Sequence, residues 1–413
     1  MRFVADGQAL RQALVDHLRE HGQLRTPRIC AAFAAVPREL FVPSVALEDA
    51  YHSSEAILVK RIDGVGVSSA SAPDVMACML EQLLPRTGHK VLEIGAGTGY
   101  NAALLAHLVG DSGLVVSLDI DADLVADARD HLSSAGYPNV RVEQGDGALG
   151  FASQAPYDRI MLTAASRDIA PAWREQLAPD GRLLLPLGVR GVQRCVAFER
   201  TEDALESVST GPCSFIPLRG ALSMDSARLP LDAQGAVLLG LPDDATLVEP
   251  GQVLDWLFEA TPPRSTDVFA RAQEVRGSLQ LWLATHDARV CSIWGEGSIS
   301  IVPELLGHSE RVRATLGFLE HTGLAILDWG QRGERGVELC VRASRNAGAL
   351  AARLIDHIRA WEAVGRPGDN ALYIRAYLRP TVVEPAASET AIDQRWSRFI
   401  LGWRAQPPAS LTV

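Results

Sequence analysis

Glycine recurs at three alternate positions, Gly95, Gly97 and Gly99, directly after a short apolar run that contains Glu93. Glycine permits a tight turn in which the backbone comes close to a ligand. A second apolar run ends in Asp119, about 20 residues beyond the turn. Backbone amides at the start of a helix, with a carboxylate at the end of the next strand, bind the polar groups of a nucleotide. The spacing therefore predicts a nucleotide-type site.

The spacing of the glycines also narrows the choice of ligand. Gly-x-Gly-x-Gly differs from the Gly-x-Gly-x-x-Gly turn that holds the pyrophosphate of a dinucleotide. The shorter pattern suits a ligand without a pyrophosphate, such as S-adenosylmethionine (SAM). The alternative is an ordinary strand–turn–helix unit with a glycine-rich corner. Strand, glycines, helix and acid agree with one another, and this agreement favours the binding site.

A serine-rich segment, Ser68–Ser71, is followed by Ala72 and Pro73 and leads into a helix predicted over residues 75–84. Ser71 has two interpretations. It can be the N-cap of that helix, with a proline near the first turn. It can also contact a substrate, because a neutral hydroxyl hydrogen-bonds a carboxylate without neutralising it. Taken alone, the local pattern favours the N-cap.

Predicted strands alternate with predicted helices through the first half of the chain. The strands are expected at 91–94, 114–119, 140–143, 157–165 and 182–188, and the helices at 6–35, 75–84, 101–109, 121–135 and 173–177. This alternation predicts an α/β fold with a doubly wound parallel sheet. Ligands of such sheets bind past the carboxyl ends of the strands, where the glycine turn, Asp119, Asp146 and Thr163 all fall.

Composition excludes several classes of function. The chain has 413 residues, which is long for one domain and comfortable for two. It has no apolar run of membrane length, and its first residues lack the apolar core of a secretory signal. The six cysteines form no Cys-x-x-Cys pair, which indicates a reducing cytoplasm and argues against a metal site. A net charge of −11 argues against nucleic acid as a partner.

The composition changes after Gly220, so we expect three segments. These are a SAM-binding domain over residues 1–220, a connector over 221–249 and an α+β domain over 250–413. The sequence does not indicate an oligomeric state.

Within the third segment, helices are expected at 250–260 and 346–364, and strands at 278–283 and 337–341. Residues 381–393 have the composition of a flexible stretch. Trp396–Trp403 is a candidate element for contacting a substrate, and its alternative is a helix docked on the core.

Residues 1–220 resemble the protein-L-isoaspartate O-methyltransferase family, and the resemblance covers none of 221–413. The motifs that carry it occur in the family's order: Val36-Pro37-Arg38 with Phe41-Val42-Pro43, Ser69-Ala70-Ser71-Ala72-Pro73, Val91–Tyr100, Gly145-Asp146-Gly147, Thr163-Ala164-Ala165 and Ser214–Leu218. The resemblance implies a class I SAM-dependent carboxyl O-methyltransferase that releases S-adenosyl-L-homocysteine.

The resemblance also implies roles for single residues. Ser71 is the catalytic residue that orients the accepting carboxylate. Eight residues are expected to line the cofactor: Ser69, Ala70, Glu93, Gly95, Gly97, Asp119, Asp146 and Gly147. Asp119 is expected to hold the ribose, the 146–147 pair the adenine edge, and Glu93 the methionine amino end.

Two departures from the family pattern concern the acceptor. Asp74 stands after the loop proline where the family often has His or Tyr, and Val59–Gly66 replaces the usual Pro-Ile-Gly-x-Gly approach. With the extra C-terminal segment, the layout resembles the branch of the family associated with ribosomal-peptide (graspetide and lanthipeptide) gene clusters. That resemblance implies methylation of an aspartate side chain in a modified precursor peptide, after which the ester cyclises to aspartimide.

Two alternatives stay open beside this interpretation. One is an isoaspartyl repair methyltransferase with an appended domain, and the other is a SAM- and peptide-binding module without transfer activity. In the first interpretation, we expect residues 250–413 to recognise the peptide and to form one wall of a groove beside the Ser71 loop.

Overall fold

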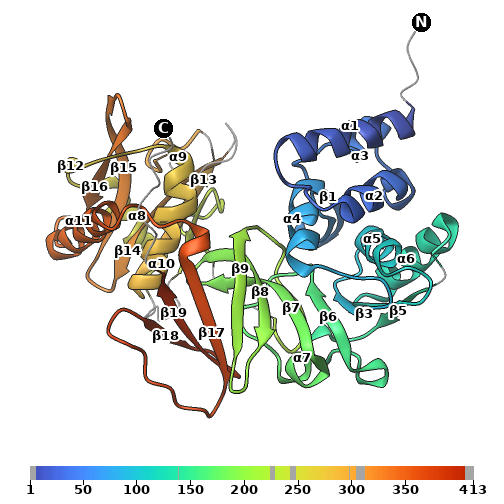
Figure 1. Ribbon diagram of the computed structural model, residues 1–413. Helices are drawn as coiled ribbons and strands as arrows, with labels where there is room; N and C mark the ends of the chain where they lie inside the picture. The colour runs from blue at the N-terminus through green and yellow to red at the C-terminus, as the bar shows by residue number, and fades with distance from the viewer. Residues whose placement is uncertain are drawn as a thin grey trace, which may run out of the picture.

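A ten-stranded sheet positions the site and draws strands from both halves of the chain (Figure 1). The computed structural model describes residues 6–137, 139–223, 228–241, 248–296, 298–303 and 312–404. The order across the sheet is β18-β19-β17-β9-β8-β7-β6-β3-β4-β5. The neighbours from β7 to β5 are parallel and comprise β3 (Lys90–Ile94), β4 (Leu114–Asp119), β5 (Val140–Gln144), β6 (Tyr157–Leu162) and β7 (Leu177–Val189).

The parallel strands confirm the predicted doubly wound α/β fold. The chain builds outward from β3 through β4 to β5, and then returns to the other side of β3 to form β6 and β7. This reversal opens a crevice beyond the carboxyl ends of β3 and β6, which is where doubly wound sheets bind ligands.

Antiparallel strands extend the sheet beyond β7. They are β8 (Val192–Arg200), β9 (Leu205–Pro212), β17 (Leu372–Leu378), β18 (Thr390–Asp393) and β19 (Ser397–Trp403). β17 pairs with β9 at Arg375 and Glu206, and thereby joins the end of the chain to the first half.

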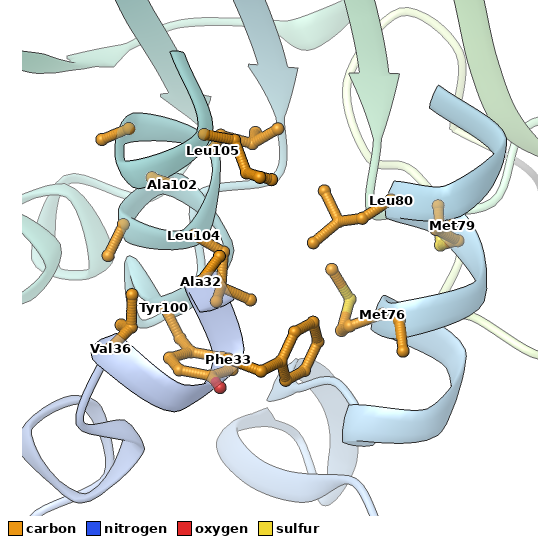
Figure 2. Packing of buried hydrophobic residues seen from close by; sticks show 14 of the residues in the cluster. Ala32, Phe33, Val36, Met76, Met79, Leu80, Tyr100, Ala102, Leu104 and Leu105 are labelled. Carbon is orange, nitrogen blue, oxygen red and sulfur yellow. The ribbon is translucent and has the colours of Figure 1, made fainter. Parts of the chain in front are cut away.

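Helices bury both faces of the parallel strands. The N-terminal half contributes α1 (Gly7–Glu20), α2 (Pro27–Ala35), α3 (Leu47–Ala50), α4 (Pro73–Leu83), α5 (Tyr100–Val109), α6 (Ala122–Ala135) and α7 (Pro171–Gln176). Figure 2 shows α2, α4 and α5 packed together through Phe33, Met76, Leu80 and Leu104, all fully or almost fully buried. This packing fixes the start of α4 and α5, and the residues that precede them border the crevice.

The remaining elements of this half are short. A hairpin is formed by β1 (Ile57–Ile62) and β2 (Val65–Ala70), which pair antiparallel. Single helical turns lie at Arg38–Phe41, Gly147–Leu149 and Ala152–Gln154, and a further one at Asp369–Ala371 precedes β17 in the second half of the chain. β2 leads directly into the corner before α4 and therefore carries the serine segment to the crevice.

A second, antiparallel sheet of seven strands lies on the far side of β7–β9 from α1–α6 (Figure 1). Its order is β10 (Arg228–Pro230), β11 (Val237–Gly240), β13 (Val290–Glu296), β14 (Val312–Glu320), β15 (Gly323–Gly333), β16 (Gly336–Ala343) and β12 (Arg264–Ala270). Its helices are α8 (Pro250–Phe258), α9 (Ala272–Glu274), the π turn Val275–Leu279, α10 (Gln280–His286) and α11 (Gly348–Ala363). None of the helices that the structure describes is long and apolar enough to cross a membrane.

The sheets divide the chain differently from the expected segments. Two strands of the seven-stranded sheet, β10 and β11, lie within the expected connector 221–249, and β17–β19 lie in the sheet of the first half rather than with 250–371. The alternative of a docked helix at Trp396–Trp403 is wrong. Residues 397–403 form the strand β19, which pairs with β17 and β18. The expected flexible stretch 381–393 contains β18.

The strand predicted at 278–283 is also wrong, because these residues belong to the π turn and α10. Leu281 packs in the apolar cluster of the ten-stranded sheet, whereas Trp282 and Leu283 pack in that of the seven-stranded sheet. A helix that is buried on opposite sides carries apolar residues all round. Its pattern therefore resembles that of a strand.

Arg194 ties the two sheets together. Its side chain extends from β8 and is 5% exposed. Nε pairs with Asp369 Oδ1 at 2.5 Å, and Nη2 donates to the carbonyl oxygen of Gly277 at 2.7 Å. The guanidinium therefore holds the segments that enter α10 and β17.

We predict that Arg194→Ala lowers the free energy of unfolding by about 3 kcal/mol or more, because it leaves a half-buried carboxylate and a carbonyl without their donor. Urea unfolding measures the loss. The matched control is Arg359→Ala, which breaks an exposed pair with Asp267 and should cost less than about 1 kcal/mol. Equal losses in the two variants would show that Arg194 does not tie the sheets together.

Candidate active site

A cavity of about 660 Å³ occupies the crevice beyond β3 and β6. Its walls come from the β1–β2 hairpin, the corner before α4, the turns after β3, β4, β5 and β6, and the segment 214–219. Among the residues that the structure describes, its lining runs from Ser54 to Arg219 and includes none from 250–413. The expected wall from the C-terminal segment is therefore wrong for this cavity, and a role of 250–413 in peptide recognition stays a prediction that concerns other surfaces.

The glycine turn lies between β3 and α5 with its glycines in the left-handed region. Gly95 has φ +103° and Gly97 has φ +51°. A Cβ at Gly95 would lie 2.4 Å from Thr163 Oγ1, at the end of β6, so only glycine lets these two strands end side by side. Both Gly95 and Gly97 line the cavity. The turn is thus where the sequence predicted a close backbone approach to a ligand.

Asp119 ends β4 and faces the cavity, although only 9% of it is exposed. Oδ2 accepts the Gly97 amide at 3.0 Å and Oδ1 accepts the Asp121 amide at 3.2 Å. Burial raises the pKa of this carboxyl above its usual value. Each oxygen keeps a second lone pair, so the carboxylate can accept hydrogen bonds from the hydroxyls of a ribose.

Glu93 is buried beneath the glycine turn with no exposed surface. It accepts hydrogen bonds from Asn101 Nδ2 at 2.7 Å and from the Ser117 hydroxyl. Burial raises the pKa of Glu93 to about 7. It does not line the large cavity, but it lines a small adjoining cavity of about 30 Å³.

The corner before α4 brings Ser69 and Ser71 to the cavity wall, whereas Ala70 lines the small cavity. The N-cap of α4 is Ala72, and it makes no side-chain cap hydrogen bond. The N-cap interpretation of Ser71 is therefore wrong. Its hydroxyl forms no hydrogen bond within the described part of the chain, and it is available to a ligand.

Asp146 and Gly147 follow β5 and differ in their positions. Asp146 Oδ1 accepts the Ala148 amide at 2.9 Å and Oδ2 accepts the Ala221 amide at 2.7 Å. The carboxylate thus orders its own turn and the segment after Gly220, and Asp146 does not line the cavity. Gly147 does line it, and a Cβ there would lie 2.4 Å from Ile94 Cγ2. Their contact with adenine stays a prediction.

Comparison with known proteins identifies the family. The model of the protein-L-isoaspartate(D-aspartate) O-methyltransferase family matches residues 9–223. The chain belongs to this family. The protein-L-isoaspartate O-methyltransferase of Methanopyrus kandleri is 41% identical over 212 residues, which are 51% of this chain and 91% of that protein. The second such enzyme of Archaeoglobus fulgidus is 39% identical over 219 residues, or 53% of this chain and 96% of that protein.

One solved structure extends the similarity beyond the family match. A protein-L-isoaspartate O-methyltransferase aligns over 88% of this chain and 96% of its own, with a TM-score of 0.50 and 21% identity. The alignment therefore includes part of the chain after residue 223, which has a counterpart in fold.

Members of the family are SAM-dependent carboxyl O-methyltransferases, so this chain is such an enzyme and its cofactor is SAM, as the glycine spacing predicted. The cavity fits this cofactor. Its volume lies within the range of ligand sites of roughly 300–1,000 Å³. Asp119 offers lone pairs for a ribose, and Ile120 and Leu218 supply apolar walls for a base. Among the residues that the structure describes, no group of three or more His, Cys, Asp or Glu side chains is arranged to hold a metal ion.

Sequence reasoning missed an ion-pair group that includes Arg219 of the cavity lining. Asp121 pairs with Arg219 at 2.6 Å and with Lys60 of β1 at 2.9 Å. The three residues join the hairpin, the turn after β4 and the segment 214–219. In the sequence, Lys60 was noted only within the segment that departs from the family pattern. Its pairing with Asp121 could not be predicted, because the two residues are far apart in the chain and leave no local pattern.

We predict that Gly97→Val abolishes binding of S-adenosyl-L-homocysteine, because a branched side chain would enter the cavity where the backbone meets the ligand. Isothermal titration calorimetry measures the affinity. The matched control is Gly136→Val, at the end of α6, where φ is also positive and no atom lies within 4 Å of an added Cβ. This control shares the backbone strain and should keep its affinity. Unchanged binding by Gly97→Val would remove the turn from the cofactor site.

We predict that Glu93→Gln flattens the pH dependence of stability. A carboxyl whose folded pKa is about 7 stays protonated in the folded chain while the unfolded chain, near pKa 4.5, releases its proton. The parent therefore loses stability, on the order of 2 kcal/mol, as pH rises from about 4.5 to 7. Urea unfolding at pH 5 and pH 8 should show this loss in the parent and little of it in the variant. The same loss in both would contradict the assignment.

Proposed function

We propose that the enzyme methylates a carboxylate at an aspartyl site of a peptide or protein. The observation that carries this proposal is the absence of a general base from the lining of the cavity within the described residues. The ionisable side chains there are Asp119, which accepts two backbone amides, and Arg219, which pairs with Asp121. An amine or alcohol acceptor needs a base to take its proton, whereas a carboxylate with a pKa of about 3.9 is already ionised.

The chain's residues supply position rather than proton transfer. When bound, SAM provides an electrophilic methyl group on a sulfonium. The Ser71 hydroxyl donates a hydrogen bond to one oxygen of the acceptor carboxylate and leaves the other oxygen free to attack. Apolar lining such as Leu58, Val75 and Phe215 excludes water from the acceptor. In-line positioning and exclusion of water are then the main contributions to the rate.

The acceptor that family membership supports best is the α-carboxylate of an L-isoaspartyl residue, since the matched family and its relatives bear that activity in their names. The second candidate is the side-chain carboxylate of an aspartate in a ribosomally made, modified precursor peptide. Either methyl ester can cyclise when the next amide nitrogen attacks the ester carbonyl and loses its proton, the C–OCH3 bond breaks and methanol leaves; both give the same five-membered imide, aspartimide.

Exposed apolar residues on the β1–β2 hairpin are the reason to retain the second candidate acceptor, the aspartate of a precursor peptide. Leu58, Val59, Ile62 and Val65 are 41%, 40%, 43% and 66% exposed. Leu58 lines the cavity, and the other three lie in the part of the same hairpin where the sequence departs from the family pattern. Together they support a peptide with an apolar segment beside the acceptor. The C-terminal segment does not separate the candidates, because part of it has a structural counterpart in a protein-L-isoaspartate O-methyltransferase.

The test is mass spectrometry of matched peptides incubated with enzyme and SAM. One sequence is offered with L-isoaspartate, with L-aspartate, and with L-aspartate within a macrocycle. Methylation or imide formation on the isoaspartyl peptide alone supports the first candidate acceptor. The same reaction on the cyclic aspartyl peptide alone supports the second candidate. Transfer only to an amine or alcohol would sink the proposal.

In the same assay, Ser71→Ala should lower kcat roughly 100-fold, because one hydrogen-bond donor to the reacting group is lost. Its melting temperature and its affinity for S-adenosyl-L-homocysteine should stay close to those of the parent, since the hydroxyl caps no helix. Ser133→Ala, on α6 and outside the cavity, is the control for a serine change and should keep full activity. Equal kcat in Ser71→Ala and the parent would refute the role of the hydroxyl.

A further inference from the structure

Lys60 stands at an irregularity in the β1–β2 hairpin. The pairing register shifts on both sides of it, and its partner across the hairpin is Ser68, the residue before Ser69 in β2. A β-bulge breaks the regular alternation of side chains along a strand and redirects one of them. The bulge thus lets the Lys60 side chain leave the hairpin while its backbone stays beside the serine segment.

The side chain of Lys60 ends at the start of α6. Its Nζ lies 2.9 Å from Asp121 Oδ2 and 2.7 Å from Asp123 Oδ1. The Lys60 side chain is 23% exposed and that of Asp121 is 15% exposed, so water shields this pair less than a fully exposed one. Arg219 donates to both oxygens of Asp121, and these hydrogen bonds hold the pKa of that carboxyl below its usual value. Asp121 is therefore ionised at neutral pH and pairs with two cations.

Asp121 also belongs to the turn that is expected to meet the cofactor. Its amide donates to Oδ1 of Asp119, the carboxylate with lone pairs for a ribose. One short turn thus borders the cofactor site through Asp119 and holds the hairpin through Asp121 and Lys60. The hairpin and this turn line the same cavity, the first through Leu58 and the second through Ile120.

The other end of the serine segment is held separately by Arg38, which is 1% exposed. Its Nη2 donates to the carbonyl oxygen of Ser71 at 3.0 Å, and its Nε donates to that of Ala50 at 2.8 Å. Nη1 has no hydrogen-bond partner, and no carboxylate of the described residues forms an ion pair with the guanidinium. The segment is therefore held at the backbone of Ser71, whereas the position of its β2 end depends on the hairpin.

We propose that Lys60 is a positioning residue for methyl transfer. By holding β1 against the start of α6, it fixes the β2 end of the segment Ser68–Ser71 and thereby the direction of the Ser71 hydroxyl relative to the cofactor. Lys60 does not line the cavity, so it acts through the hairpin and not by contact with a ligand. This role rests on the proposed function, in which the Ser71 hydroxyl orients the acceptor carboxylate.

The first test compares Lys60→Met and Lys60→Arg with the parent, on the aspartyl or isoaspartyl peptide that the parent methylates. Lys60→Met loses the charge, and kcat/KM for the peptide should fall roughly 10-fold because the hydroxyl is misplaced. Lys60→Arg can form the same ion pairs and should stay within about threefold of the parent. The affinity for S-adenosyl-L-homocysteine, measured by isothermal titration calorimetry, should change less than about threefold in both.

The matched control is Lys90→Met, which removes the other lysine of the chain at the opposite end of β3 from the glycine turn. It should keep the kcat/KM of the parent. Unchanged kcat/KM in Lys60→Met would overturn the proposal. So would a Lys60→Met variant that weakens S-adenosyl-L-homocysteine as much as it lowers kcat/KM, because that result assigns Lys60 a general structural role.

A double variant tests whether Lys60 acts through Ser71. Adding Lys60→Met to Ser71→Ala should lower kcat/KM by less than about a further threefold, because the group that Lys60 positions is already absent. A further loss as large as that of Lys60→Met alone would show that the two residues act independently, and it would overturn the proposal.

Hydrogen–deuterium exchange decides the role of Lys60 even if the parent methylates none of the peptides, a result that would count against the proposed function alone. With S-adenosyl-L-homocysteine bound, the amides of residues 65–71 should exchange at least about threefold faster in Lys60→Met than in the parent, since the hairpin opens more often. Lys90→Met should match the parent. Equal exchange in all three proteins would refute the positioning role.

Discussion

The architecture of the site depends on the close approach of β3 and β6 at their carboxyl ends. The chain leaves β3 in one direction and returns on the other side, so the two connections diverge and leave a crevice between them. Gly95 lies so near Thr163 that a single methyl group would not fit. A side chain at this point would push the strands apart or fill the crevice. The shape of the crevice therefore depends on the absence of a side chain at Gly95.

Buried charge is distributed around the crevice in a consistent way. Asp119 faces the large cavity and Glu93 the small one, and both have raised pKa values because they are removed from water. Each is stabilised by two donors from the chain, so neither depends on a ligand. Arg38 differs, because carbonyl oxygens supply only part of what its guanidinium can bind. In the proposed mechanism, the neutral Ser71 hydroxyl leaves the charge of the acceptor carboxylate intact.

Local patterns predicted the parallel sheet, the glycine turn and Asp119, because each depends on residues close together in the chain. They failed where partners are distant. Trp396–Trp403 shows no mark of the antiparallel pairing that makes it β19, and the apolar 278–283 segment gives no hint that it is buried between two sheets. The Ser71 cap was a reasonable expectation from the sequence, yet the N-cap falls one residue later, at Ala72, and α4 begins at Pro73. In the sequence, Arg38 was noted only as part of a family motif. Its burial without a counter-ion could not be predicted, because that burial follows from the fold.

The addition of β17 to β9 has a consequence for how the protein is made. A ribosome synthesises Leu205–Pro212 long before Leu372–Leu378, so the nascent methyltransferase half has to wait with the edge of β9 unpaired. An open edge next to apolar residues invites pairing with other chains. The intervening seven-stranded sheet pairs neighbours in sequence, such as β13 with β14, and can fold in that interval. The last strands then complete the first sheet and cover the edge of β9.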